Sequence, residues 1–217
     1  FCSYNVPSIY QVPLILDEQG MGDYICERLK LQCRKPKWQE WKQFVDSVVK
    51  PSFEVKIALV GKYAGLADSY VSMNEALHHS GAAHQTRVTI DYIEAEKLEH
   101  DPIAIKKLEG YDGVFIPYGF GPRGTEGKIK AIHFTRENDI PFLGICFGFQ
   151  LAVIEFARNV CGLEGANSTE MNPETPYPVI DLMPEQRGVE VKGATMRLGA
   201  HKIVIKKRTL AHRLYGA

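Results

Sequence analysis

The stretch Ile140-Pro141-Phe142-Leu143-Gly144-Ile145-Cys146-Phe147-Gly148-Phe149-Gln150 decides the fold of this chain. An apolar run of strand character leads into a cysteine flanked by glycines, and a helical pattern over 150–160 follows at once. Gly-x-Cys-x-Gly is the thiol counterpart of the Gly-x-Ser-x-Gly nucleophile elbow. The glycines fit a tight turn, because a side chain on either side of the apex would clash. The pattern therefore predicts a strand, a sharp turn with Cys146 at its apex, and a helix.

Two interpretations of Cys146 are open on this pattern alone. At the start of a helix, the dipole and free N–H groups favour an anion, which raises the thiolate fraction of a cysteine. The N–H of Phe147 would then donate to an oxyanion formed at the same point. The other interpretation is a structural cysteine, because free cysteine is among the most buried residue types.

Strand and helix patterns alternate through the middle of the chain. Buried strands are predicted at 55–61, 86–93 and 113–117. Helices are predicted at 68–79, with Gly81 as the stop signal, and at 102–108 and 127–137. Shorter strands at 178–180, 194–198 and 202–207, and a helix near 210–215, are expected to follow. This alternation predicts an α/β fold with a doubly wound, mostly parallel sheet, whose site lies at the carboxyl ends of the strands.

The chain divides by pattern into three parts. Residues 1–33 are too few to build a core and are interpreted as the tail of a larger domain. Residues 34–53 hold Trp38 and Trp41 at helical spacing and are interpreted as a linker helix. Residues 54–217 carry the α/β pattern.

Composition excludes some partners and bounds the compartment. The 217 residues include 26 basic and 26 acidic ones, a balance that does not favour nucleic acid or an anionic membrane as a partner. No apolar run approaches the length of a membrane span. The five cysteines form no Cys-x-x-Cys pair, so we expect a reducing, cytoplasmic compartment and neither a zinc ribbon nor a redox dithiol.

A second half of the site is predicted directly after the third strand. Tyr118-Gly119-Phe120-Gly121-Pro122-Arg123-Gly124 holds more glycine and proline than a turn requires. Backbone N–H groups at Gly119 and Phe120 would complete an oxyanion hole with Phe147. The alternative is a flexible surface loop. None of the seven histidines has an acidic partner in an obvious motif, so a Cys-His-acid site looks incomplete.

These residues resemble the class I (triad) glutamine amidotransferases, and the surrounding chain is similar to the CTP synthase family among them. The similar segments are Gly61-Lys62-Tyr63, Asp68-Ser69-Tyr70, Glu126-Gly127-Lys128-Ile129, 154–160, 167–170 and 195–199. The resemblance implies a flavodoxin-like glutaminase domain over 54–217, C-terminally incomplete. It also implies that 1–33 is the C-terminal tail of a synthetase (amidoligase) domain. A cysteine hydrolase of another family with a similar elbow would leave 167–170 and 195–199 unexplained.

The resemblance also implies an activity and its partners. One domain would hydrolyse glutamine, and the other would use ATP and Mg²⁺ to aminate UTP to CTP. GTP would act as an allosteric activator near the glutaminase site. Such enzymes are typically homotetramers. No metal ligand is expected in this chain, because the nucleotide and Mg²⁺ sites would belong to the synthetase domain.

Carried over position by position, the resemblance assigns three groups of residues. Cys146 matches the nucleophile that forms the glutamyl thioester. The residues implied to bind glutamine are Gly119, Phe147, Gly148, Phe149, Gln150 and Glu170. Those implied to lie near GTP are Phe120, Arg123 and Arg197.

Two departures from the family pattern bear on activity. The family's catalytic His and Glu lie in a His-Pro-Glu stretch beyond residue 217. Tyr118 stands where the family usually has glycine, and tyrosine takes a positive φ at greater cost. The alternative hypothesis is therefore a glutaminase-like binding or regulatory module that is inactive as it stands.

Overall fold

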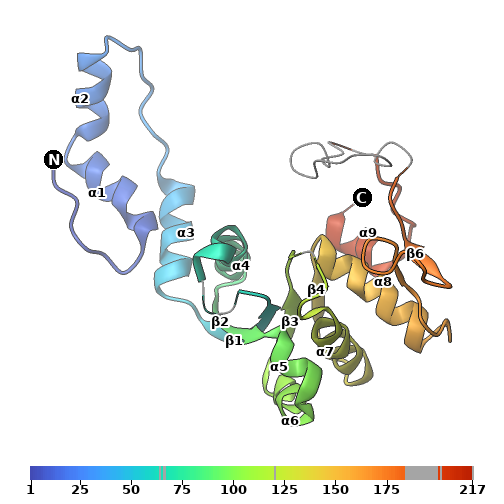
Figure 1. The fold of residues 1–217 in the computed structure, drawn as a ribbon. Helices are drawn as coiled ribbons and strands as arrows, with labels where there is room; N and C mark the ends of the chain where they lie inside the picture. Colours follow the sequence, from blue (N-terminus) through green and yellow to red (C-terminus); the bar gives the residue numbers. More distant parts are fainter. Residues whose placement is uncertain (64, 66, 120, 184–199, 201, 217) are drawn as a thin grey trace. The chain divides into compact units, whose positions relative to one another are not determined.

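The computed structural model describes residues 1–63, 65, 67–119, 121–183, 200 and 202–216. The chain divides into two compact units, Phe1–Ile180 and Asp181–Ala217. The first unit holds a parallel four-stranded sheet in the order β2-β1-β3-β4 (Figure 1). Its strands are β1 (Phe53–Gly61), β2 (Thr86–Glu94), β3 (Gly113–Ile116) and β4 (Phe142–Gly144). The predicted parallel sheet is confirmed.

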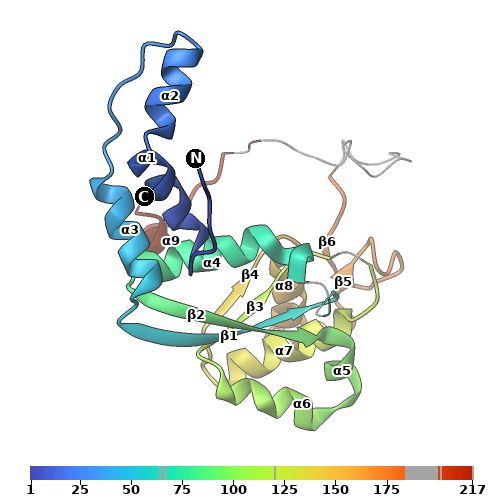
Figure 2. The same cartoon turned by 90° about the vertical axis from the view of Figure 1, so that its left-hand side faces the viewer.

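Helices cover both faces of this sheet, as a doubly wound fold requires. Figure 2 shows α4 on one side of β1 and β2 and α7 on the other. The helices of this layer structure are α4 (Val71–Ala83), α5 (Ala95–His100), α6 (Pro102–Lys106), α7 (Thr125–Glu137) and α8 (Phe147–Asn159). A short 3-10 turn, η2 (Ala67–Tyr70), precedes α4, and another, η3 (Lys107–Gly110), follows α6.

The core divides along the strands in the alternation expected of a pleated sheet. Ala58 and Val60 of β1 belong to the larger cluster, which includes Phe147, Leu151 and Ile154 of α8. Leu59, between them, belongs to the smaller cluster. The other buried members of that cluster are Tyr70, Met73 and Phe115.

Helix α4 differs from its predicted bounds at both ends. It begins at Val71, after η2, and it runs through Gly81 to Ala83. Gly81 is buried against the next strand, and a Cβ there would lie 2.5 Å from the carbonyl oxygen of Thr86. Glycine at 81 therefore permits close packing of helix on strand and does not end the helix.

Three further segments differ from the predictions or fall outside the described residues. Helix α5 was not predicted, and the helix predicted at 102–108 is divided into α6 and η3. The strand expected at 202–207 is irregular chain, whereas the helix near 210–215 is confirmed as α9 (Leu210–Tyr215). The strand expected at 194–198 lies outside the described residues. The strand at 178–180 is confirmed as β6 (Pro178–Ile180), which pairs in parallel with β5 (Asn167–Ser168).

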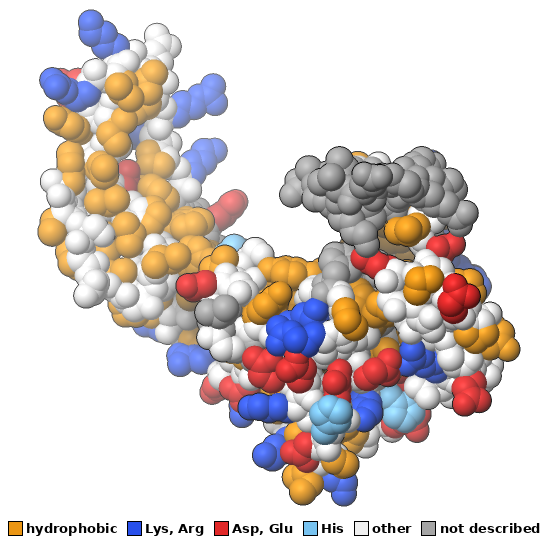
Figure 3. Space-filling model, in the orientation of Figure 1, with side chains coloured by type: hydrophobic (Ala, Val, Ile, Leu, Met, Phe, Trp, Pro, Cys, Tyr) orange, Lys and Arg blue, Asp and Glu red, His pale blue; other side chains and the backbone are white. Residues whose placement is uncertain are grey.

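An N-terminal arm precedes the sheet. It contains η1 (Ile9–Gln11), α1 (Val12–Glu18), α2 (Met21–Arg28) and α3 (Gln39–Val49). Figure 3 shows hydrophobic side chains gathered over the arm. Large hydrophobic residues of the arm that are exposed include Ile9, Tyr24, Leu29 and Leu31. The domain boundaries at 33 and 53 remain a prediction.

The arm is cross-linked by a disulfide between Cys26 and Cys33, whose Cα atoms are 6.2 Å apart. The spacing of these two cysteines matches no cysteine motif, so the sequence predicts reduced thiols and the disulfide differs from that prediction. A disulfide is not what a reducing compartment favours, so the cysteines no longer argue for one. Separately, in the part of the chain that the structure describes, no helix has the length and apolar character needed to cross a membrane.

Candidate active site

Cys146 occupies the apex of a strained turn between β4 and α8. Its backbone has φ 55° and ψ −113°, in the positive-φ region that non-glycine residues rarely adopt. Its carbonyl oxygen accepts hydrogen bonds of 3.1 Å from the N–H groups of both Phe149 and Gln150. The residue is exposed. The predicted strand, turn and helix are confirmed, and the alternative of a buried structural cysteine is excluded.

The two flanking glycines are needed because backbone approaches backbone. A Cβ on Gly148 would lie 2.0 Å from the carbonyl oxygen of Ile116, and one on Gly144 would lie 2.7 Å from the carbonyl oxygen of Gly148. Atoms cannot approach so closely without displacing the chain. Ile116 ends β3, and its carbonyl also accepts a 3.0 Å hydrogen bond from the N–H of Ile145. The elbow is therefore fixed directly to the strand that leads into the 118–124 loop.

The residues after the nucleophile divide between the core and the surface. Phe147 is 2% exposed and packs in the larger cluster, and Gly148 is also buried. Phe149 is 61% exposed, and Gln150 is half-buried. The Phe147 side chain thus anchors the first turn of α8, while Phe149 and Gln150 remain accessible to a ligand.

The 118–124 loop takes conformations that suit its glycines. Gly119, Gly121 and Gly124 have φ values of 127°, 94° and 72°. The non-glycine residues with positive φ in the described chain are Lys30, Gln85, Asp139, Cys146 and Arg208. Tyr118 is not among them, so this conformation does not impose the positive-φ strain that a tyrosine at this position could bring. The Tyr118 hydroxyl instead donates to the carbonyl oxygen of Ser69, and its ring lies 5.9 Å from that of Tyr70.

Two lysines lie beside this loop, and sequence reasoning assigned neither of them a role. The Nζ of Lys62 donates to the carbonyl oxygen of Gly121 at 3.4 Å. The Nζ of Lys128, on α7, would lie 3.5 Å from a Cβ placed on Gly119, and it lies 5.5 Å from the ring centre of Phe147. Lys128 therefore contacts both halves of the site. A signal was present, because Lys128 shares a helical face with the apolar residues at 131 and 132.

Burial changes the acid–base behaviour of both lysines. Burial, followed by the neighbouring charge of Lys62, lowers the pKa of Lys128 to about 8. The pKa of Lys62 is also lowered, mainly by burial and then by the charge of Arg123, although Glu96 opposes this. Desolvation disfavours the charged form of an amine in each case.

Of the remaining predicted site residues, the structure describes two, Glu170 and Arg123. Glu170 is exposed in the turn after β5, and its N–H donates to the hydroxyl of Ser168 at 3.2 Å. Arg123 pairs with Glu96 at 3.1 Å and donates to the carbonyl oxygen of Lys62 at 3.2 Å. Phe120 and Arg197 lie outside the described residues.

Comparison with known proteins agrees with this geometry. A family profile described as glutamine amidotransferase class-I matches residues 65–215. The chain is 56% identical over 214 residues to a CTP synthase of Thermococcus gammatolerans, covering 99% of this chain and 40% of that protein. It is 53% identical over 215 residues to a CTP synthase of Methanocaldococcus jannaschii, covering 96% of this chain and 40% of that protein. The chain thus spans less than half the length of these relatives.

A solved structure, the Trypanosoma brucei CTPS glutaminase domain with bound acivicin, is similar in fold with a TM-score of 0.57. It is 43% identical, and the match covers 61% of this chain and 52% of that chain. The matched family profile covers more than half of the present chain, including the elbow and the 118–124 loop. The chain therefore belongs to the class-I glutamine amidotransferase family.

Proposed function

We propose that this chain hydrolyses glutamine through Cys146, and that the ammonia released serves the ATP-dependent amination of UTP to CTP. The exposed thiol at a strained elbow, with φ 55°, carries the first part of this proposal. Strain retained at one residue marks a site where geometry matters more than local stability. The similarity to CTP synthases over 99% of the chain supports the second part.

The reaction divides into two acyl transfers at one carbon. The Cys146 sulfur attacks the amide carbon of glutamine, and the carbonyl electron pair moves to oxygen. The N–H groups of Phe147 and Gly119 would hold that oxyanion. The C–N bond then breaks, and the nitrogen leaves as ammonia after gaining a proton. Water attacks the resulting thioester and expels the thiolate, giving glutamate.

The other assigned residues would hold glutamine in place. The exposed carboxylate of Glu170 suits the positive α-amino group of the substrate. Phe149 and Gln150 face the accessible side of α8, and Gly148 lets the chain pass close to β3. The base and acid of the reaction are assigned to a His and a Glu outside this chain, as the family pattern implies.

Nucleotides and metal belong to the wider proposal. ATP, UTP and Mg²⁺ are assigned to a synthetase domain, as the family resemblance implies. GTP binding is assigned to Phe120, Arg123 and Arg197, as the family resemblance implies. We place the enzyme in the cytoplasm as a homotetramer.

The test is a cysteine substitution in the full-length protein that contains this chain. Cys146→Ala should reduce glutamine-dependent CTP formation by about 10³-fold or more, while ammonia-dependent formation persists. Cys161→Ala is the matched control, because Cys161 is also free and exposed. A Cys146→Ala protein that still used glutamine would overturn the proposal.

Covalent labelling distinguishes this function from the alternative of an inactive binding module. A glutamine-mimicking diazo ketone should give a single adduct on Cys146, read by peptide mass spectrometry. Folded protein that acquires no adduct would favour the binding module.

A further inference from the structure

Lys128 is a buried charge to which the described part of the chain offers no hydrogen-bond partner. Its side chain is 1% exposed, and its Nζ has no hydrogen-bond partner among the described residues. An ammonium group is costly to bury unless it is paired and hydrogen-bonded. A buried lysine that lacks both is therefore expected to acquire a partner in another state of the site.

The charges around Lys128 do not compensate it within the described structure. Lys62 faces it with a like charge. The carboxylate of Glu96 pairs with Arg123, and the carboxylate of Glu99 accepts from the N–H of Gly127 at 3.4 Å. These two carboxylates of α5 are thus engaged by other groups.

Residues from both halves of the proposed oxyanion hole lie near the Lys128 Nζ. A Cβ on Gly119 would lie 3.5 Å away, and the Phe147 ring centre lies at 5.5 Å. A planar trans peptide points its C=O and its N–H in opposite directions. A carbonyl turned toward Lys128 from the loop would therefore turn the N–H of the same peptide away from it.

We propose that Lys128 is a positioning residue for the oxyanion hole. Its ammonium group donates to the carbonyl oxygen of Tyr118 when substrate is bound, and this turns the N–H of Gly119 toward Cys146. The inference rests on the proposed glutamine hydrolysis and assigns Lys128 no contact with the substrate.

Acid–base behaviour supports this role and supplies a readout. Burial lowers the pKa of Lys128 to about 8. The group is therefore protonated at neutral pH and loses its proton just above it. Oxyanion stabilisation should weaken over the same interval.

The experiment uses the γ-aldehyde analogue of glutamate, which adds the Cys146 thiol to form a tetrahedral thiohemiacetal. Its affinity is measured for the full-length protein and for its Lys128→Met and Lys130→Met variants. Methionine keeps the length of the chain without the charge. Lys130 is the matched control, because it lies two residues away on α7 and donates to the carbonyl oxygen of Glu99. Alkylation by iodoacetamide, a displacement that forms no oxyanion, is measured in parallel.

We expect Lys128→Met to weaken aldehyde binding by about 10- to 100-fold. Alkylation of Cys146 in this variant should change less than about threefold, and so should aldehyde binding by Lys130→Met. Unchanged aldehyde binding in Lys128→Met would overturn the inference and leave the proposed function standing. Wild-type protein that binds no aldehyde would overturn the proposed function, and the inference with it.

The pH profile tests the inference without a variant. The affinity of the wild-type protein for the aldehyde should fall above about pH 8. The rate of alkylation by iodoacetamide, measured over the same pH range, corrects this affinity for titration of the thiol itself. A profile that stays flat to pH 10 would overturn the role of Lys128 even if Lys128→Met failed to fold.

Discussion

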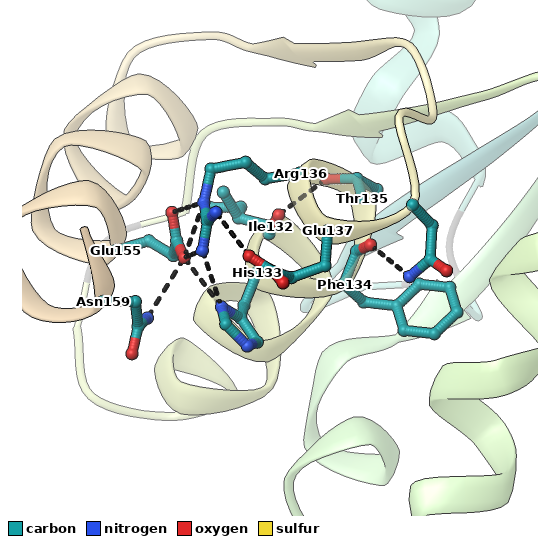
Figure 4. A network of polar contacts seen from close by, with 9 residues as sticks. Ile132, His133, Phe134, Thr135, Arg136, Glu137, Glu155 and Asn159 are labelled. Carbon is teal, nitrogen blue, oxygen red and sulfur yellow. Dashed lines mark hydrogen bonds and ion pairs between the residues drawn. The ribbon is translucent and has the colours of Figure 1, made fainter.

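The guanidinium group of Arg136 on α7 holds the carboxylate of Glu155 on α8 through both of its oxygens. Nη2 donates to Oε1 at 2.9 Å, and Nε lies 3.2 Å from Oε1 and 3.1 Å from Oε2 (Figure 4). The Nδ1 of His133 lies 2.9 Å from the same carboxylate, and the amide of Asn159 donates to it at 3.1 Å. Glu155 itself is 1% exposed. A buried carboxylate is thus surrounded by hydrogen-bonding partners.

This network joins the two helices that carry the halves of the site. Helix α7 follows the 118–124 loop, and α8 begins directly after Cys146. The network lies on the later turns of both helices, away from the nucleophile. The network therefore fixes the relative positions of the two helices. Its loss should lower the stability of the folded protein.

Replacing Glu155 by Gln should lower the free energy of unfolding by about 2 kcal/mol, because a buried ion pair loses one partner. The matched control is Glu126→Gln, which breaks another ion pair between α7 and α8. Glu126 lies 3.0 Å from Arg158, and its side chain is 56% exposed. That control should cost less than about 1 kcal/mol. Urea titration measures both, and equal costs would contradict the prediction.

Glu155 should also contribute to acid sensitivity. Burial would raise the pKa of Glu155, but hydrogen bonds from Arg136, His133 and Asn159 outweigh burial and hold the pKa below its usual value of 4.5. A depressed folded-state pKa stabilises the protein above the unfolded pKa, and this stability is lost as the pH falls through the folded value. Glu155→Gln should therefore flatten the loss of stability below pH 4.5. Acid titrations of the two proteins, followed by circular dichroism, measure this effect. Titration curves with the same midpoint and slope in both proteins would contradict the prediction.

Gly148→Ala should disrupt the elbow itself. The added Cβ would lie 2.0 Å from the carbonyl oxygen of Ile116, so strand β3 or helix α8 must move. We expect a destabilisation of about 1 to 3 kcal/mol, with loss of diazo ketone labelling at Cys146. Gly110→Ala is the control, because a Cβ there meets no atom within 4 Å. Normal labelling in a stable Gly148→Ala protein would show that the close approach is not required.

The elbow and the sheet could be predicted because their signals are local. Gly144, Cys146 and Gly148 define a turn within five residues, and the strand patterns at 55–61 and 113–117 are rich in apolar residues. Each of these signals depends on backbone conformation or on hydrophobic period, which a single sequence displays. The fold class followed from their alternation.

The features that were missed depend on contacts between distant residues. Gly81 reads as a helix stop, but it is required by the carbonyl of Thr86 on the next strand. Helix α5 has only six residues, too few for a clear helical period. The burial of Lys128 depends on the 118–124 loop and on Phe147, which the sequence alone does not bring together. The disulfide of the arm likewise joins cysteines whose spacing matches no motif.

Tyr10 joins the arm to helix α4 and should make this junction sensitive to base. Its hydroxyl donates to Glu75 and lies 2.6 Å from the Nε2 of His79. Burial, followed by the hydrogen bond to Glu75, raises the pKa of Tyr10 to about 12. A raised pKa stabilises the folded state below the unfolded value near 10, and this stability is lost as the pH rises toward 12.

Tyr10→Phe keeps the ring contacts with Trp41 and Phe44, whose centres lie 5.9 and 4.9 Å away, but removes the hydroxyl. Amide exchange in η1 and α1 should therefore accelerate about fivefold at neutral pH, because one hydrogen bond is worth about 1 kcal/mol. Tyr4→Phe is the control, since Tyr4 is 59% exposed. Exchange in β1 and β3 should not change in either variant, because the arm opens without the sheet. Equal exchange in η1 for wild type and Tyr10→Phe would mean that the aromatic contacts alone hold the arm.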